Sequence, residues 1–249
     1  MEEYLIEARG LSKTYGNLKA VDDLTISIRK GEIFGFLGPN GAGKTTTILM
    51  FLGLTEPTQG MVRVCGFDPV KNPLNVKRRT GYLPEHLGFY EDMTARQNLL
   101  YVARLNGISE EEATSRIERA LEEVGLEEVA DRRVSTFSKG MRQRLGIAEV
   151  LIKEPELVLL DEPTIGLDPE STIHMLEMVR SLSRDRGMTV FLSSHLLDQV
   201  QRISDRVGIM IKGRLVAEGP IEELAKRKLG VEREDYTLEE IYLKFFREA

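Results

Sequence analysis

The sequence predicts an α/β fold with a mainly parallel central sheet, an N-terminal antiparallel β portion and an inserted helical subdomain. Short apolar runs alternate with helical patterns in the first third of the chain and again from residue 157, whereas the stretch between them is helical. The run at 33–37 leads directly into a glycine-rich loop. Strands that alternate with helices imply parallel pairing, with helices covering both faces of the sheet.

The first third of the chain alternates between strand and helix signals. Residues 24–28 alternate in polarity and include β-branched side chains, which is typical of a strand. The apolar run at 33–37 ends at Gly38 and Pro39, where a strand gives way to a loop. The elements expected here are strands at 24–28 and 33–37, a helix at 45–54, and strands at 61–65 and 81–84.

The stretch 86–154 has few strand signals and is predicted to be a helical insertion. Helices are expected at 95–105, 110–124 and 141–153. Ser109 and Glu112 have the spacing of a capping box at the start of the second helix, and Gly125 follows its end.

The α/β pattern resumes with a strand at 157–160, a helix at 170–183, a strand at 189–193 and a helix at 196–203. Lys212-Gly213 then marks a hairpin turn. Thr237 and Glu240 form a second expected capping box, before the apolar helical face of Leu238, Ile241, Tyr242, Phe245 and Phe246. The predicted organisation is an α/β core at 1–85 and 155–220, a helical subdomain at 86–154, and a C-terminal helical extension at 221–249.

Composition limits the classes of protein that the chain can represent. Its 249 residues include one cysteine, Cys65, so an intramolecular disulfide and a multi-cysteine zinc module are excluded. The net charge of −6 gives no general attraction to nucleic acid, and the basic run 77–79 is expected to be a solvated face. No basic-then-apolar leader precedes the first strand, and no apolar run approaches the roughly 20 residues of a membrane span.

Residues 38–45 match the phosphate-binding loop pattern, with Gly38, Gly43, Lys44 and Thr45 at the required positions. Backbone N–H groups of such a loop approach phosphate oxygens, Lys44 reaches the β and γ phosphates, and the Thr45 hydroxyl binds Mg²⁺. An ordinary glycine turn is disfavoured by the placement between a strand and a helix. The core is therefore predicted to be that of a P-loop NTPase, and the nucleotide-binding residues expected in this loop are Gly38, Pro39, Asn40, Gly41, Ala42, Gly43, Lys44, Thr45 and Thr46.

Two acids follow the apolar run 157–160. Asp161 suits the coordination of Mg²⁺, and Glu162 is then free to act as a general base toward water. Such a pair is often a solvated turn, but its presence with a phosphate loop favours a role in nucleotide chemistry.

The run Ser138-Lys139-Gly140-Met141-Arg142-Gln143 precedes the acidic strand, and in this arrangement the chain resembles the ABC ATPase family over nearly its whole length. The resemblance implies that Ser138 and Gly140 belong to the family's signature, which contacts nucleotide. It also implies roles for four further residues: Tyr15 stacks on adenine, Glu85 takes the position of the glutamine-loop residue and binds Mg²⁺, Asp168 lies in a loop at the dimer interface, and His195 acts near the γ phosphate.

Each of these residues also has an ordinary explanation, because a lone tyrosine is usually packing and a lone histidine after a strand is usually a satisfied cap. Cys65, His86 and His174 are assigned to structure alone. Two departures from the family pattern stand out: Lys139 replaces the first signature glycine, and Glu85 replaces glutamine. A carboxylate can bind Mg²⁺ but cannot donate a hydrogen bond to water.

The resemblance implies an ATP-binding and ATP-hydrolysing subunit of an ABC transporter, with Lys44, Glu162 and His195 as catalytic residues and Mg²⁺ held by Thr45, Glu85 and Asp161. The implied partners are a second ABC ATPase subunit, identical or a paralogue, and an integral membrane permease, with no nucleic acid. Residues 81–85 resemble the export and drug-resistance branch. The expected location is cytoplasmic, peripheral at the inner face of the membrane. A non-transport ABC protein of DNA repair or translation and a P-loop kinase are the alternatives.

An apolar cluster follows Glu85 and fits neither strand nor helix spacing. Its members are Leu87, Gly88, Phe89, Tyr90 and Met93. One hypothesis is that the cluster forms a docking surface for the membrane partner, since the family receives a short helix at this junction. The other is that Phe89 and Tyr90 cap the small core of the helical insertion.

Overall fold

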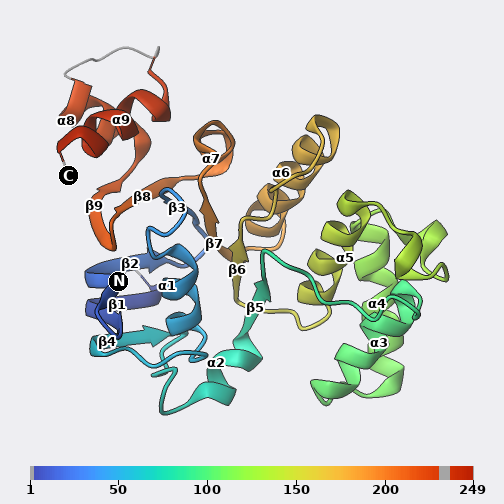
Figure 1. Cartoon of the computed structure of the whole chain (residues 1–249). Coiled ribbons are helices and arrows are strands. Elements are labelled where there is room, and N and C mark those ends of the chain that lie inside the picture. Colours follow the sequence, from blue (N-terminus) through green and yellow to red (C-terminus); the bar gives the residue numbers. More distant parts are fainter. Residues whose placement is uncertain (1–2, 230–235, 249) are drawn as a thin grey trace.

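The computed structural model describes residues 3–229 and 236–248, which form two sheets with helices packed around them (Figure 1). The larger sheet has the strand order β5-β6-β7-β3-β8-β9 and is parallel except for the β8–β9 pair. The smaller sheet is antiparallel, with the order β2-β1-β4. The predicted fold class is confirmed.

The strands of the larger sheet are β3 (Ile33–Leu37), β5 (Thr80–Leu83), β6 (Leu157–Asp161), β7 (Thr189–Ser194), β8 (Arg206–Ile211) and β9 (Arg214–Gly219). Those of the smaller sheet are β1 (Tyr4–Tyr15), β2 (Leu18–Arg29) and β4 (Gln59–Val64).

The larger sheet is buried on both faces, which explains its uninterrupted apolar strands. Successive residues of a strand point to opposite faces, so Phe34 and Phe36 of β3 join one hydrophobic cluster while Ile33 and Leu37 join the other. Helix α1 (Lys44–Phe51) and the antiparallel sheet pack on the phenylalanine face, where Phe191 stacks on Phe34 with ring centroids 5.9 Å apart.

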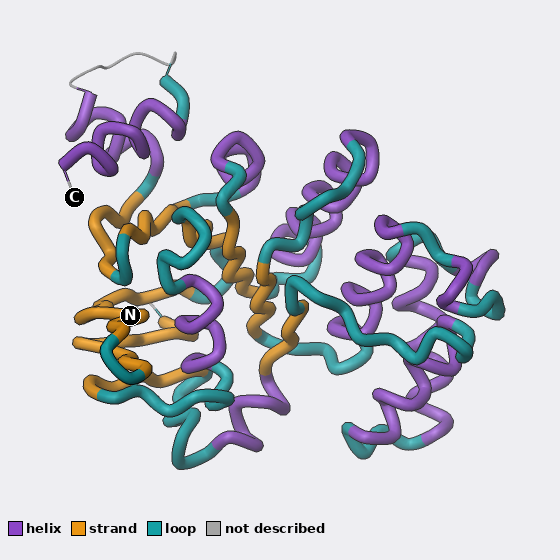
Figure 2. The backbone as a smooth tube through the Cα atoms, viewed as in Figure 1, coloured by secondary structure: helices purple, strands orange, loops and turns teal. Residues whose placement is uncertain are grey.

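The opposite face is covered by helices α6 (Pro169–Arg184) and α7 (Leu197–Ile203). Beyond the β5 edge lies the helical part of the chain, which Figure 2 shows as a group of coils beside the strands. It contains α3 (Ala95–Leu105), α4 (Glu110–Glu123), the 3-10 turns η1 (Glu127–Val129) and η2 (Val134–Thr136), and α5 (Lys139–Leu151). The C-terminal helices are α8 (Ile221–Leu229) and α9 (Leu238–Glu248).

The sequence predicts most of the helices and strands, but not every residue at which they begin or end. The helix expected at 45–54 ends at Phe51, because the chain turns at Gly53, whose φ is +65° and whose Cβ, if present, would lie 2.3 Å from the Pro69 carbonyl oxygen. Helix α2 (Pro73–Arg79) and the long strand β1 were not predicted individually. Both owe their conformation partly to distant contacts: Val76 of α2 is fully buried in the core, and β1 pairs with two strands.

Side-chain caps begin several helices. Thr237 and Glu240 exchange reciprocal hydrogen bonds of 3.2 Å, which confirms the capping box of α9. At α4 the Ser109 hydroxyl accepts from the Glu112 N–H at 3.3 Å, but the Glu112 carboxylate pairs with Arg116 instead of returning to Ser109. The expected box at α4 is therefore only half formed.

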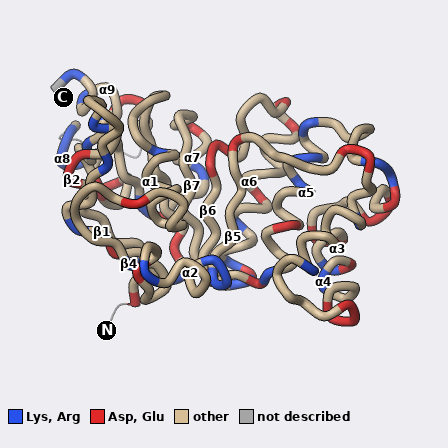
Figure 3. The backbone as a smooth tube through the Cα atoms, turned by 60° about the horizontal axis from the view of Figure 1, so that its bottom comes forward, with Lys and Arg blue, Asp and Glu red and all other residues tan. Residues whose placement is uncertain are grey.

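Charged residues of both signs are interspersed over the sheet and the helical part (Figure 3). In the basic run at the end of α2, Arg79 forms an ion pair of 2.5 Å with Glu156 and lies over the Phe67 ring. This arginine is therefore engaged by its own chain.

Candidate nucleotide-binding site

The phosphate loop connects β3 to α1, as the sequence predicts. Gly43 has φ +103°, and a Cβ at this position would lie 2.3 Å from the Ala20 carbonyl oxygen. A Cβ on Gly38 would lie 2.5 Å from the Met210 carbonyl oxygen. Glycine is thus required at both positions by close backbone approach, and at Gly43 also by the backbone conformation.

Lys44 is buried at the start of α1, with its amine turned toward the loop. Its Nζ donates to the Gly38 carbonyl at 2.7 Å and to the Pro39 carbonyl at 3.3 Å. The same Nζ lies 3.1 Å from Oε1 of Glu162. The lysine of the phosphate loop and the candidate base are therefore in direct contact.

Glu162 lies just past β6 with φ +51°, an uncommon conformation for a residue with a side chain. Its Oε2 accepts from the His195 backbone N–H at 3.3 Å and lies 2.9 Å from Nδ1 of His195. Its Oε1 is buried and has the ion-pair contact with Lys44, but it accepts no well-formed hydrogen bond from the described residues. One acceptor position of this carboxylate thus remains open.

Thr45 and Asp161 form the oxygen-rich part of the site. The Thr45 hydroxyl donates to Oδ2 of Asp161 at 2.8 Å, and the Ser193 hydroxyl donates to the other carboxylate oxygen. No group of three or more His, Cys, Asp or Glu side chains within 3–229 and 236–248 could hold a metal by itself. Mg²⁺ is commonly held by one or two protein ligands together with substrate phosphates, so these hard oxygen donors fit it.

A pocket of about 600 Å³ opens above the phosphate loop and gathers most of the predicted residues. Tyr15 and Glu85 lie on its wall, and the Tyr15 side chain is 46% exposed. The predicted residues that line it are Tyr15, Asn40, Gly41, Gly43, Lys44, Thr45, Thr46, Glu85 and Glu162. The same loop also contains Gly38, Pro39 and Ala42, which do not line the pocket. Two further predicted residues contact lining residues: Asp161 accepts a hydrogen bond from Thr45, and His195 contacts Glu162.

The pocket has a further wall that the sequence did not indicate. It contains Leu18, Lys19 and Ala20 at the start of β2, Ile165, and Lys212-Gly213. The hairpin turn reaches the phosphate loop because the Gly213 N–H donates to the Ala42 carbonyl at 3.1 Å. The turn itself was predicted from the Lys-Gly pair, but its place beside the loop depends on the order of strands β3 and β8.

Three predicted residues lie outside this pocket and close to one another: Ser138, Gly140 and Asp168. Ser138 is the N-cap of α5 and accepts from the Met141 N–H at 3.2 Å, while Asp168 is the N-cap of α6 and accepts from the Ser171 N–H at 2.9 Å. A Cβ on Gly140 would lie 2.8 Å from the Ser171 hydroxyl. Hydrogen bonds from Ser171 lower the pKa of the Asp168 carboxyl. Two helix N-termini thus adjoin each other outside the pocket.

Lys139, the unusual signature residue, points toward the loop of Asp168. A Cβ on Gly166 would lie 2.4 Å from the Lys139 Nζ, so the end of the lysine side chain lies against this glycine. The departure from the family pattern is therefore accommodated by contact between the signature and this loop.

Comparisons with known proteins agree with this geometry. A model of the ABC transporter family matches residues 21–165. The bacitracin transport ATP-binding protein BcrA of Bacillus licheniformis is 46% identical over 223 residues, covering 90% of this chain and 72% of BcrA. The Nod factor export ATP-binding protein I of Burkholderia orbicola (strain AU 1054) is 38% identical over 225 residues, covering 90% and 74%.

A solved ATP-binding subunit of an ABC transporter superposes on the chain with a TM-score of 0.86 and 33% identity, covering 97% of this chain and 99% of that structure. Within the described part of the chain, no helix is long and apolar enough to cross a membrane. The sequence relatives, the structural match and the phosphate-loop pocket lead to the same conclusion: the chain belongs to the ABC transporter family, as an ATP-binding subunit.

Proposed function

We propose that this subunit hydrolyses ATP and thereby powers export through a separate membrane-embedded partner. The observation that carries the proposal is the contact series from Lys44 through Glu162 to His195 at the base of the pocket. Lys44 would bind the terminal phosphates, and Glu162 would accept a proton from the attacking water while His195 orients the carboxylate. In-line attack on the γ phosphorus breaks its bond to the bridging oxygen and releases ADP and phosphate.

The remaining pocket residues would bind and orient the substrate. Backbone N–H groups of residues 40–46 would contact phosphate oxygens, and the exposed Tyr15 ring would stack on adenine. Thr45, Asp161 and Glu85 would hold Mg²⁺ directly or through water. When bound, this ion supplies charge neutralisation for the phosphate oxygens.

The position of Ser138, Gly140 and Asp168 away from the pocket supports a two-subunit site. Each chain would offer its phosphate loop to one nucleotide and its α5 N-terminus to the other, in an assembly with twofold symmetry. The second subunit would be an identical chain or a paralogue.

Export and location are inferred from the relatives. One relative is named for bacitracin transport and the other for Nod factor export, so transport is favoured over DNA repair or translation. The subunit would then act at the inner face of the membrane, attached through its permease.

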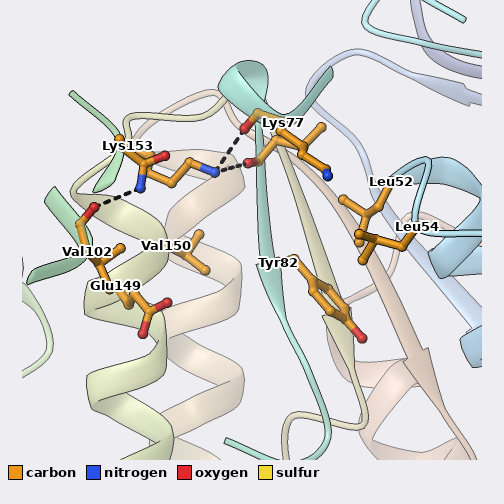
Figure 4. A pocket seen from close by; sticks show the side chains of 10 residues that line it. Leu52, Leu54, Lys77, Tyr82, Val102, Glu149, Val150 and Lys153 are labelled. Carbon is orange, nitrogen blue, oxygen red and sulfur yellow. Dashed lines mark hydrogen bonds between the residues drawn. The ribbon is translucent and has the colours of Figure 1, made fainter. Parts of the chain in front are cut away.

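A second cavity, of about 210 Å³, marks where the permease would attach (Figure 4). It lies between the end of α1, strand β5 and helices α3 and α5, and apolar side chains of Leu52, Leu54, Tyr82, Val102 and Val150 contribute to its lining. We propose that a short helix of the membrane subunit occupies this groove.

The polar groups of the groove indicate the charge of that helix. Lys153 is engaged, because its Nζ donates to the Lys77 and Thr80 carbonyls at 2.9 and 2.8 Å. Glu149 has no hydrogen-bond or ion-pair partner among the described residues, and burial raises the pKa of its carboxyl. We therefore propose that the bound helix presents a cation to Glu149, which has no ion pair with any described residue, and apolar side chains to the rest of the groove.

The proposed groove differs from the docking surface that one of the two sequence-based hypotheses placed at residues 87–93. Phe89 packs partly buried against the larger core, as does Leu87. Tyr90, which the alternative hypothesis also assigns to a core, is 53% exposed and contacts Tyr101. None of these residues lines the cavity.

Phosphate release from ATP by the purified chain tests the enzymatic proposal. We expect release with Mg²⁺ and none with EDTA, and equal release in both would remove the metal from the mechanism. The docking proposal is tested by Leu54→Glu, which changes a groove residue that is 53% exposed. Co-purification with a co-expressed membrane subunit should be lost, while basal ATPase is retained. Leu105→Glu, on a residue that is 68% exposed and does not line the groove, is the control.

A further inference from the structure

Gln201 of α7 binds the start of α9 with both ends of its amide. Its Oε1 accepts from the Leu238 N–H at 2.7 Å, and its Nε2 donates to the Tyr236 carbonyl at 3.3 Å. Leu238 is the first residue of α9, so its N–H has no acceptor within its own helix. Gln201 therefore satisfies a helix end that belongs to the C-terminal extension.

The other side of α7 contacts the catalytic part of the core. Residues two apart on a helix are separated by about 200° around its axis, and Gln199 accordingly faces away from Gln201. Its Oε1 accepts from the Thr164 hydroxyl at 2.5 Å. Thr164 is buried and lies two residues beyond Glu162. Figure 1 shows α7 between the C-terminal helices and α6.

Helix α7 is also connected directly to the histidine of the site. It begins at Leu197, two residues after His195, whose Nδ1 lies 2.9 Å from Glu162. The helix has no side-chain cap at its N-terminus, and the nearest polar anchor is the Ser194 hydroxyl, which accepts from the Leu196 N–H at 3.0 Å. His195 thus lies between the end of β7 and the start of α7, so a shift of α7 would act on it directly through the chain.

We infer that Gln201 is a positioning residue through which the C-terminal extension sets the geometry of the His195–Glu162 pair. Docking of α9 on Gln201 holds α7 in the position that keeps the imidazole on the carboxylate. Any event that displaces α9 would shift α7 and slow hydrolysis without altering the pocket that binds ATP. The expected change in hydrolysis rate rests on the proposed ATPase function. The expected change in the position of His195 does not.

The kinetic test uses Gln201→Met in the full chain, which keeps side-chain length but removes both hydrogen bonds. We expect kcat to fall about tenfold, because a small misplacement of a catalytic group has effects of this order or larger, with KM within twofold of wild type. Gln201→Glu should restore part of the rate, since a carboxylate still accepts from the Leu238 N–H and suits a helix N-terminus but cannot donate to the Tyr236 carbonyl. Asp198→Asn, on the exposed face of α7, is the matched control and should retain wild-type kcat.

The structural test does not require turnover. The chain contains three histidines, so the ring signals of His195 can be assigned in NMR spectra by comparison with His195→Gln. Gln201→Met should shift these signals, while those of His86 and His174 stay in place. Unchanged His195 signals, or a kcat equal to wild type, would overturn the inference. An equal loss in Gln201→Glu or Asp198→Asn would overturn it as well, since it would show general damage to α7. A wild-type chain without ATPase activity would refute the proposed function while leaving the NMR test decisive.

Discussion

The amine of Lys44 lies 3.1 Å from the carboxylate of Glu162, and both side chains are buried in the site. Lys44 begins helix α1 and Glu162 follows strand β6, so the pair joins segments more than a hundred residues apart. The contact pairs two charges that would otherwise be costly to bury. It also means that an incoming phosphate competes with Glu162 for the same amine, so nucleotide binding would release the carboxylate toward water.

Replacement of Glu162 should separate binding from hydrolysis. Glu162→Gln keeps the shape of the side chain but cannot accept a proton, so kcat should fall by about two to four orders of magnitude. ATP affinity should stay near that of wild type, and the variant should accumulate as an ATP-bound dimer. Phosphate release, calorimetry and size-exclusion chromatography check the three outcomes. Wild-type turnover would exclude Glu162 as the base.

Removal of the lysine should weaken binding itself. Lys44→Ala deletes the cation that reaches the phosphates, and it leaves Oε1 of Glu162 buried without its counter-charge. Both ATP affinity by calorimetry and the melting temperature should therefore fall. Lys30→Ala, on an exposed residue that pairs with Glu3, should change neither. Unchanged affinity in Lys44→Ala would contradict the phosphate-loop assignment.

Two glycines of the loop provide a matched comparison. An alanine at Gly43 would collide with the Ala20 carbonyl, whereas the space around Gly41 is open within 4 Å, and both residues have positive φ. Gly41→Ala should therefore cost only the backbone strain, about 1–2 kcal/mol. Gly43→Ala should cost more stability and also lower ATP affinity. Denaturant unfolding measures the loss of stability in each variant, and calorimetry measures the loss of ATP affinity. Equal losses in Gly41→Ala and Gly43→Ala would refute the prediction.

The α5 N-terminus should act on the partner's nucleotide. Ser138→Arg in both subunits should abolish activity, and so should Lys44→Ala in both. A mixture of the two variants forms heterodimers with one site free of both changes, so part of the ATPase activity should return. The control is each variant mixed with itself. Activity in either variant alone would argue against a shared site.

Glu149 should make stability depend on pH. Burial raises the pKa of its carboxyl above the ordinary 4.5, so the folded protein holds this proton more tightly than the unfolded chain. Ionisation of Glu149 therefore lowers the free energy of unfolding as the pH rises past that value. The nearby charge of Lys153 opposes this shift but does not cancel it.

Glu149→Gln cannot ionise and should melt at a higher temperature than wild type near neutral pH. The difference should shrink as the pH falls toward 4.5. Glu122→Gln, on the exposed face of α4, should show no such trend. A pH-independent difference for Glu149→Gln would show that the carboxylate is not destabilising.

The sequence by itself determined the parts of this protein that depend on neighbouring residues. The glycines, lysine and threonine of the phosphate loop all lie within residues 38–45, between β3 and α1. Asp161 ends the apolar strand β6, and Glu162 follows it. The capping box at Thr237 likewise depends on residues three apart. Such features are encoded locally, since backbone conformation and helix ends respond to a few adjacent side chains.

Tertiary structure alone decided which distant segments meet. The start of β2 and the Lys212-Gly213 turn form a pocket wall only because β8 pairs with β3 beside the phosphate loop. Phe89 is partly buried because it lies against the larger core, which no periodicity of residues 87–93 reveals. The bond from Gln201 to α9 joins residues 37 apart. These contacts arise from strand order and helix packing, which depend on burial of apolar surface across the whole chain rather than on local propensity.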